Sequence, residues 1–152
     1  MTSRPIQYVP GEYVVGCILS VPVMTEVGEI SHKGILSDRT GPDGLPMVIH
    51  NAKLAGNVVE NTMTFFYTKA IGPVRSEGYP SKLAPHVVLA RARTQIGKPW
   101  RVLDNCEHFA HYAHDLPQKS PELRRKAKQG GIAITGFLTA CFFLASRGAA
   151  PL

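Results

Sequence analysis

The sequence predicts an α+β domain in which a small antiparallel sheet is followed by helices. Pro and Gly interrupt the first half of the chain at short intervals, and the β-branched runs between them are typical of strands joined by turns. After Pro80 the apolar residues recur at helical spacing instead. Because the strands come first and the helices afterwards, an alternating α/β fold is not expected.

Five short runs are candidate strands, each bounded by turn residues. The loop over residues 37–46 is rich in Asp, Gly and Pro, which is the composition of a hairpin loop. The strands on its two sides are therefore expected to pair as antiparallel neighbours. The five runs are Tyr13–Leu19, His32–Ser37, Met47–His50, Gly56–Glu60 and Thr64–Lys69.

Two helices are expected in the second half. The first covers Ser81–Gly97, where Ser81 can cap the helix, Pro85 fits its first turn and Gly97 ends it. The second begins near Asp104 or Asn105 and runs to about His114, before Pro117.

Length and composition bound the class of protein. A chain of 152 residues with 44% hydrophobic and 18% charged residues is long enough for one globular domain with a modest core. Its net charge of +6 favours an anionic partner, either a nucleic acid or a phospholipid surface. The three cysteines are an odd number without CxxC spacing, which argues against a disulfide framework and for a reducing, cytoplasmic location. The N-terminal residues lack the apolar core of a secretory signal peptide, so export by that route is not expected.

The last part of the chain differs in character from the rest. We expect a first domain over residues 1–116 and a separate segment over 117–152, in which a basic stretch precedes a strongly apolar run at 132–145. Residues 130–146 carry no charge, and the run is near the lower length limit of about 17 residues for a spanning helix. Two interpretations stay open, a buried core helix and a membrane anchor with basic flanks.

Cys106 is the candidate nucleophile. If Asn105 caps the helix, Cys106 is its first residue, where the helix dipole lowers the pKa of a thiol. The N–H groups of the same turn are placed to hold an oxyanion, so Asn105 is expected to support it. The alternative is a small, inert, buried thiol, which is the expectation for Cys17 and Cys141 in their apolar runs.

A nucleophilic thiol needs a base, and His32 and His50 are the candidates. They lie on the two strands that flank the loop at 37–46, so both imidazoles can project toward one site. One would accept the thiol proton while the other orients it. His108, His111 and His114 are spaced by three on the second helix, but a polar helix face explains that spacing better than a metal site.

The order of these motifs resembles the lecithin retinol acyltransferase-like domain. The matching strings are His32-Lys-Gly-Ile, Val48-Ile-His, Asn105-Cys-Glu-His-Phe and the helix before them at 90–97, and the resemblance covers about residues 10–114. That family resembles circularly permuted NlpC-type and papain-like thiol hydrolases, and this fold is what the resemblance implies here.

The resemblance also implies roles. Cys106 would be the nucleophile, His32 the general base and His50 the third member that positions the imidazole. The implied reaction is acyl transfer from a glycerophospholipid ester, through a thioester on Cys106, to water or a second acceptor, without a cofactor or a metal. The implied partners are a phospholipid or acyl substrate and an anionic membrane surface, which the basic stretch and the apolar run would contact.

The chain departs from the family around the first histidine. The animal enzymes usually place a Tyr before it and a Trp after it, whereas Ile30, Ser31 and Lys33 stand here. Two alternatives to the lipid enzyme remain open: a thiol amidase or peptidase with the same triad, and a non-catalytic protein that binds a membrane or a partner. Nucleic-acid binding is not expected, since basic and aromatic residues do not interleave in a known recognition module.

Overall fold

The structure is a computed structural model that describes residues 13–101 and 105–117. The chain divides into two compact units, residues 1–118 and 119–152. The predicted basic stretch and apolar helix lie outside the described residues, as does Cys141. Within the described ranges, no helix has the length and apolar character needed to cross a membrane.

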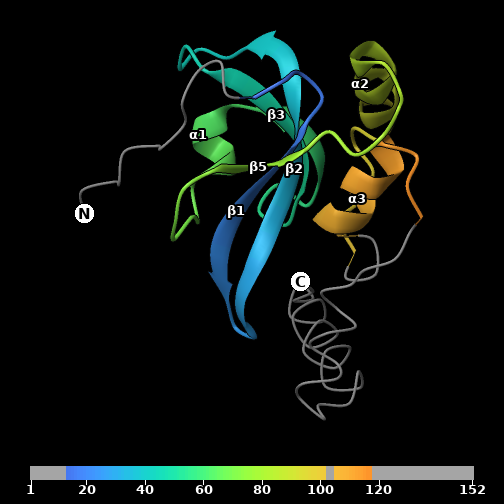
Figure 1. Cartoon of the computed structure of the whole chain (residues 1–152). Helices are drawn as coiled ribbons and strands as arrows, with labels where there is room; N and C mark the ends of the chain where they lie inside the picture. The colour runs from blue at the N-terminus through green and yellow to red at the C-terminus, as the bar shows by residue number, and fades with distance from the viewer. Residues whose placement is uncertain (1–12, 102–104, 118–152) are drawn as a thin grey trace, which may run out of the picture. The chain divides into compact units, whose positions relative to one another are not determined.

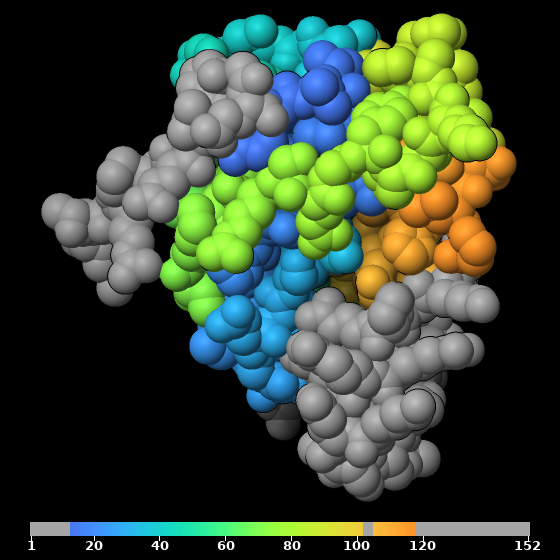
Figure 2. Space-filling view, in the orientation of Figure 1, coloured from blue at the N-terminus to red at the C-terminus, as the bar shows by residue number. Residues whose placement is uncertain are grey.

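Five antiparallel strands form the sheet (Figure 1). The order is β4-β3-β2-β1-β5, so three hairpins are followed by a crossing from one edge to the other. In Figure 2 the yellow-green segment that holds β5 passes over the blue β1 with which it pairs. The strands are β1 (Ile18–Thr25), β2 (Gly28–Thr40), β3 (Pro46–Ala52), β4 (Asn57–Asn61) and β5 (Arg75–Gly78).

The mixed α+β class and the pairing across the loop after β2 are confirmed, but the strand boundaries differ from those predicted. The first strand was expected over Tyr13–Leu19, whereas β1 begins only at Ile18 and continues to Thr25. Thr64–Lys69 is not a strand, because the helix α1 (Met63–Phe66) begins there. The Thr62 hydroxyl caps α1 by accepting from the N–H of Phe65, and Asp43 accepts from both the N–H and the hydroxyl of Thr64. The strand β5 was not predicted, because its four residues are exposed and carry no apolar pattern.

Two longer helices follow, α2 (Pro85–Thr94) and α3 (Cys106–Ala113). Ser81 does not cap α2; the helix starts at Pro85 after Ala84, whose side chain makes no capping bond. Ser81 contacts the ring of His114 instead, with its Oγ 2.8 Å from Nδ1. The start of α3 is the predicted one.

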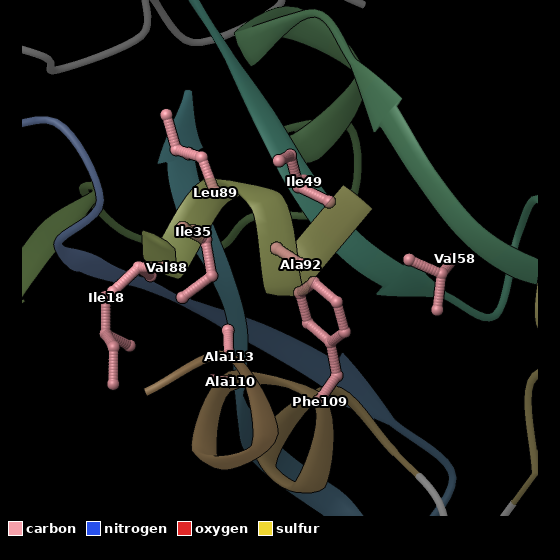
Figure 3. Close-up of a cluster of buried hydrophobic side chains, with 10 residues drawn as sticks. All are labelled: Ile18, Ile35, Ile49, Val58, Val88, Leu89, Ala92, Phe109, Ala110 and Ala113. Carbon is pink, nitrogen blue, oxygen red and sulfur yellow. The ribbon is translucent and has the colours of Figure 1, made fainter. Parts of the chain in front are cut away.

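The two faces of the sheet are covered by different helices. On one face, apolar side chains of the strands pack against α2 and α3 (Figure 3). On the other face, a second apolar cluster includes Met63 and Phe66 of α1. Strand alternation therefore decides which helix each residue of β2 meets. The first cluster comprises Ile18, Ile35, Ile49, Val58, Val88, Leu89, Ala92, Phe109, Ala110 and Ala113.

Candidate active site

The sheet brings the two predicted histidines into direct contact. Nε2 of His32 lies 2.8 Å from Nδ1 of His50. Leu36 on β2 pairs with Val48 on β3, and continuing that register places His50 opposite Gly34 and diagonal to His32. Both side chains thus project from the same face of neighbouring strands, as the sequence predicts.

Gly34 makes room for this pair. A Cβ atom at position 34 would lie 2.5 Å from Cγ1 of Val48 and 3.2 Å from Cβ of His50. The first of these separations is far below van der Waals contact, so a side chain at position 34 would push β3 away. Glycine is therefore required by the close approach of the strand that carries His50.

Aromatic rings of α1 cover the imidazole pair. The ring of Phe66 lies 5.1 Å from that of His32 and 5.2 Å from that of His50, between centroids. Phe65 lies 5.9 Å from His50 in an edge-on arrangement. The two histidines thus face an apolar wall on their side of the sheet.

This environment keeps both imidazoles neutral. Burial lowers the pKa of His32 from its ordinary value to about 4. The pKa of His50 lies well below its ordinary value because of burial and, to a smaller extent, the charge of His32. At neutral pH the pair is therefore uncharged, and one N–H···N hydrogen bond joins it.

Cys106 is the first residue of α3, and Asn105 is its cap. The Oδ1 atom of Asn105 accepts from the N–H groups of Glu107 and His108, at 3.0 and 3.3 Å. The predicted cap is therefore present, but it occupies two of the first-turn donors that were expected to hold an oxyanion. Those two N–H groups serve the helix end rather than a substrate.

The thiol of Cys106 reaches the strand that carries His32. Its Sγ atom lies 3.9 Å from the carbonyl oxygen of Ser31, the residue before His32. Phe109 of α3 packs with Ile35 on one face of β2, whereas the His32 ring contacts Phe66 on the other. Cys106 thus approaches β2 from the α3 side, beside the backbone from which the imidazole of His32 projects.

Three charged residues near Cys106 form a cluster that the sequence did not assign to the site. Nζ of Lys33 lies 2.9 Å from Oε2 of Glu77 and 3.8 Å from Oε1 of Glu107. The side chains of Lys33 and Glu107 are 14% and 8% exposed, so these two groups are largely desolvated, whereas that of Glu77 is 35% exposed. In the sequence, Lys33 stood out only as a departure from the family pattern, and β5, which carries Glu77, gave no signal at all.

The other histidines of α3 have separate partners. Nδ1 of His108 contacts Asn105, Nδ1 of His111 contacts the carbonyl oxygen of Pro117, and Nε2 of His114 contacts that of Gly16. Residues 13–101 and 105–117 contain no group of three or more His, Cys, Asp or Glu arranged to hold a metal ion.

Cys17 has the environment expected of a core thiol. It is fully buried, and burial raises the pKa of its thiol above the ordinary value. Cys106, by contrast, lies next to charged groups at a helix N-terminus and is 9% exposed.

The site described above has the composition of a thiol–imidazole centre: one cysteine at a capped helix start and two hydrogen-bonded histidines on adjacent strands. Comparison of the chain with known protein families, with curated proteins and with solved structures finds no match.

Proposed function

We propose that this chain is a cysteine-dependent acyltransferase or phospholipase A that acts on a glycerophospholipid ester through a thioester on Cys106. One observation carries the proposal. Two neutral imidazoles joined at 2.8 Å lie on the neighbouring strands β2 and β3, and Sγ of Cys106 lies 3.9 Å from the carbonyl oxygen of Ser31, the residue before His32 on β2. A nucleophile, a base and a group that orients the base are the parts that covalent acyl transfer needs.

The proposed base is His32. Its Nε2 atom contacts His50, so Nδ1 is the ring nitrogen left to accept the thiol proton. For this, Nε2 of His32 must carry a proton and donate it to Nδ1 of His50. In this role His50 fixes the tautomer and the orientation of the His32 ring.

The proposed reaction proceeds in two steps. In the first, the thiol proton passes to His32, the sulfur of Cys106 forms a bond to the ester carbonyl carbon, and the carbon–oxygen ester bond breaks. The leaving alkoxide takes the proton from His32. In the second, water or another acceptor gives a proton to His32, attacks the thioester and releases the sulfur, which regains its proton.

The order of elements supports a circularly permuted papain-like arrangement as the finer description of the fold. Strands with the two histidines precede the helix with the cysteine, and the helix packs on the sheet.

The lipid as acyl donor rests on the sequence. The net charge of +6 suits an anionic leaflet, and the basic stretch before the apolar run at 132–145 has the composition of a segment that associates with membranes. We therefore propose a cytoplasmic protein that meets its substrate at a membrane surface.

The test uses the full chain with vesicles of phosphatidylcholine, alone and mixed with an anionic phospholipid. We expect a lysolipid product, an acyl group on Cys106 in intact-mass spectra, and the loss of both in Cys106→Ser. The matched control is Cys17→Ser, which should keep both signals where the variant folds.

Two results would point elsewhere. Turnover of peptide or amide substrates with an acyl-Cys106 adduct, but none with lipids, would identify an amidase or peptidase. No adduct on Cys106 with either substrate class, together with vesicle binding, would identify a non-catalytic membrane-binding protein.

A further inference from the structure

A compact charge cluster lies between β2, β5 and the start of α3. Lys33 pairs with Glu77 at 2.9 Å and with Glu107 at 3.8 Å, and Glu107 directly follows Cys106 in the chain. Ser31 and Lys33 lie two residues apart on β2, so both face α3, and the carbonyl of Ser31 is the one that Cys106 Sγ meets. The cluster therefore lies on the same side of β2 as the sulfur, close enough for the charges of Lys33 and Cys106 to interact.

The sign of each charge matters for the thiol. A carboxylate beside a sulfur disfavours the thiolate, and this effect is stronger in a desolvated site. Glu107 is 8% exposed, so water screens its charge poorly. An ammonium group held at this position offsets that repulsion.

His32 does not supply the positive charge. Burial lowers its pKa to about 4, so it carries no charge in the neutral range. Lys33 behaves in the opposite way. Burial alone would lower the pKa of its ammonium, but the hydrogen bond and charge of Glu77, with the charges of Glu107 and Cys106, raise it above its ordinary value. Lys33 therefore remains protonated throughout the range in which a thiol titrates.

We propose that Lys33 is a positioning residue of the site, whose buried ammonium offsets the Glu77 and Glu107 carboxylates and so sustains the thiolate of Cys106. The proposal rests on the proposed function only in that the ionised sulfur is the nucleophile. Because its pKa is low, the imidazole of His32 does not carry the positive charge that favours the thiolate. Lys33 on the same strand carries that charge instead. This role also gives a physical reason for a lysine directly after His32.

The titratable groups on the elements next to Cys106 come from β2, β5 and α3. They are Lys33 on β2, Glu77 on β5, and Glu107 and His108 on α3, together with His32, whose ring lies on the other face of β2. The test changes Lys33 and Glu107 and keeps the other three constant.

The experiment measures the rate of iodoacetamide alkylation of Cys106 against pH, with the site identified by mass spectrometry of peptides. For Lys33→Met we expect the midpoint to rise by about one pH unit, which is about tenfold less thiolate below the midpoint. Lys33→Arg should keep the midpoint of the unchanged chain. Lys82→Met is the matched control, since it removes an exposed lysine from the loop before α2. It should leave the midpoint of Cys106 alkylation unchanged.

A double variant separates charge from structure. In Lys33→Met/Glu107→Gln the midpoint should return most of the way, because the carboxylate that Lys33 offsets is gone as well. Glu107→Gln alone should lower the midpoint. Protection of the buried Cys17 from alkylation reports folding in the same spectra.

Several outcomes would overturn the proposal. These are an unchanged midpoint in folded Lys33→Met, a rise that Lys33→Arg does not prevent, and a Cys106 that no pH makes reactive. Should Lys33→Met unfold, Glu107→Gln still decides, because an unchanged or higher midpoint there contradicts the proposal. The alkylation rate needs no substrate, so an absent acyl product with the expected midpoints would refute the proposed function and leave this inference standing.

Discussion

Nε2 of His32 and Nδ1 of His50 lie 2.8 Å apart, across two antiparallel strands whose register Leu36 and Val48 define. Two neutral imidazoles share one proton in such a contact, so one ring donates and the other accepts. The Nε2 atom of His50 is buried and has no hydrogen-bond partner among the residues that the structure describes. The ring of Phe66 stands at 89° to the His50 ring, at 5.2 Å between centroids.

This geometry leads to a prediction about tautomers. We expect His50 to carry its proton on Nε2, where an N–H group near the Phe66 ring gains a weak N–H···π contact, and His32 to donate through its own Nε2. Nitrogen-15 NMR of the histidine side chains at neutral pH distinguishes the two tautomers. A proton on Nδ1 of His50 would mean that His32 accepts from it and has no lone pair left on Nδ1 for the thiol.

The low pKa of His32 predicts a dependence of stability on pH. The pKa is about 4 in the folded chain and about 6.5 when unfolded, so between these values the unfolded state binds more protons. The free energy of unfolding should therefore fall as the pH falls from about 6.5 to about 4, by on the order of 3 kcal/mol at most from this group. Urea unfolding at a series of pH values measures this fall in the free energy of unfolding.

His50 and His114, whose pKa values are also lowered, contribute to the pH dependence in the same direction. The difference between the unchanged chain and His32→Gln isolates the share of His32, and equal slopes would contradict the prediction.

Gly34→Ala tests the close approach of β2 and β3. The added Cβ would lie 2.5 Å from Cγ1 of Val48 and 3.2 Å from the Cβ of His50. We expect a loss of about 2 kcal/mol in the free energy of unfolding, together with changed NMR shifts of both site histidines. Gly56→Ala is the comparison, because its Cβ meets open space and costs only left-handed strain at φ of +76°. Histidine shifts that move equally in both variants would argue against the steric explanation.

Phe66→Ala tests the aromatic cover. Phe66 is 2% exposed and touches both imidazoles, so its removal should cost about 4 kcal/mol and admit water to the pair. The pKa of His32 should then rise from about 4 toward its ordinary value, which a proton NMR titration of the histidines records. Phe65→Ala, whose ring contacts His50, should move the pKa of His32 less. A His32 pKa that stays near 4 in folded Phe66→Ala would show that other groups exclude the water.

Asn105→Ala tests the helix start that carries Cys106. The change removes the acceptor for the N–H groups of Glu107 and His108 and should cost about 1 kcal/mol in the free energy of unfolding. Asn105→Asp keeps a capping oxygen and should restore the stability. It also places a carboxylate next to Cys106, so the pH midpoint of alkylation should rise in Asn105→Asp. Equal stability of the three proteins would mean that the cap contributes little here.

The sequence predicted the parts of the fold that have a local signal. The hairpin across residues 37–46 follows from its turn residues, and the start of α3 follows from Asn105. Thr64–Lys69 has a β-like composition, but the Thr62 cap and the two bonds from Asp43 make α1 there. Asp43 and Thr64 are 21 residues apart, so a local window does not include both.

The residues of the candidate site also divide into those that have a local sequence signal and those that do not. Cys106, His32 and His50 could be nominated from residue type, spacing and predicted strands. The Lys33 cluster could not, because Glu77 enters it through β5, which pairs with β1 at the edge of the sheet. Nothing near position 77 in the sequence indicates a partner 44 residues away.

The amino-acid order by itself determined which residues hold reactive atoms, where the turns fall and which residue starts α3, since each depends on neighbours along the chain. Only the tertiary structure decided which ring covers which imidazole, that Gly34 must lack a side chain, and which charges surround the sulfur. The reason is physical: burial, van der Waals exclusion and desolvated charge act through space between strands and helices that meet only after folding.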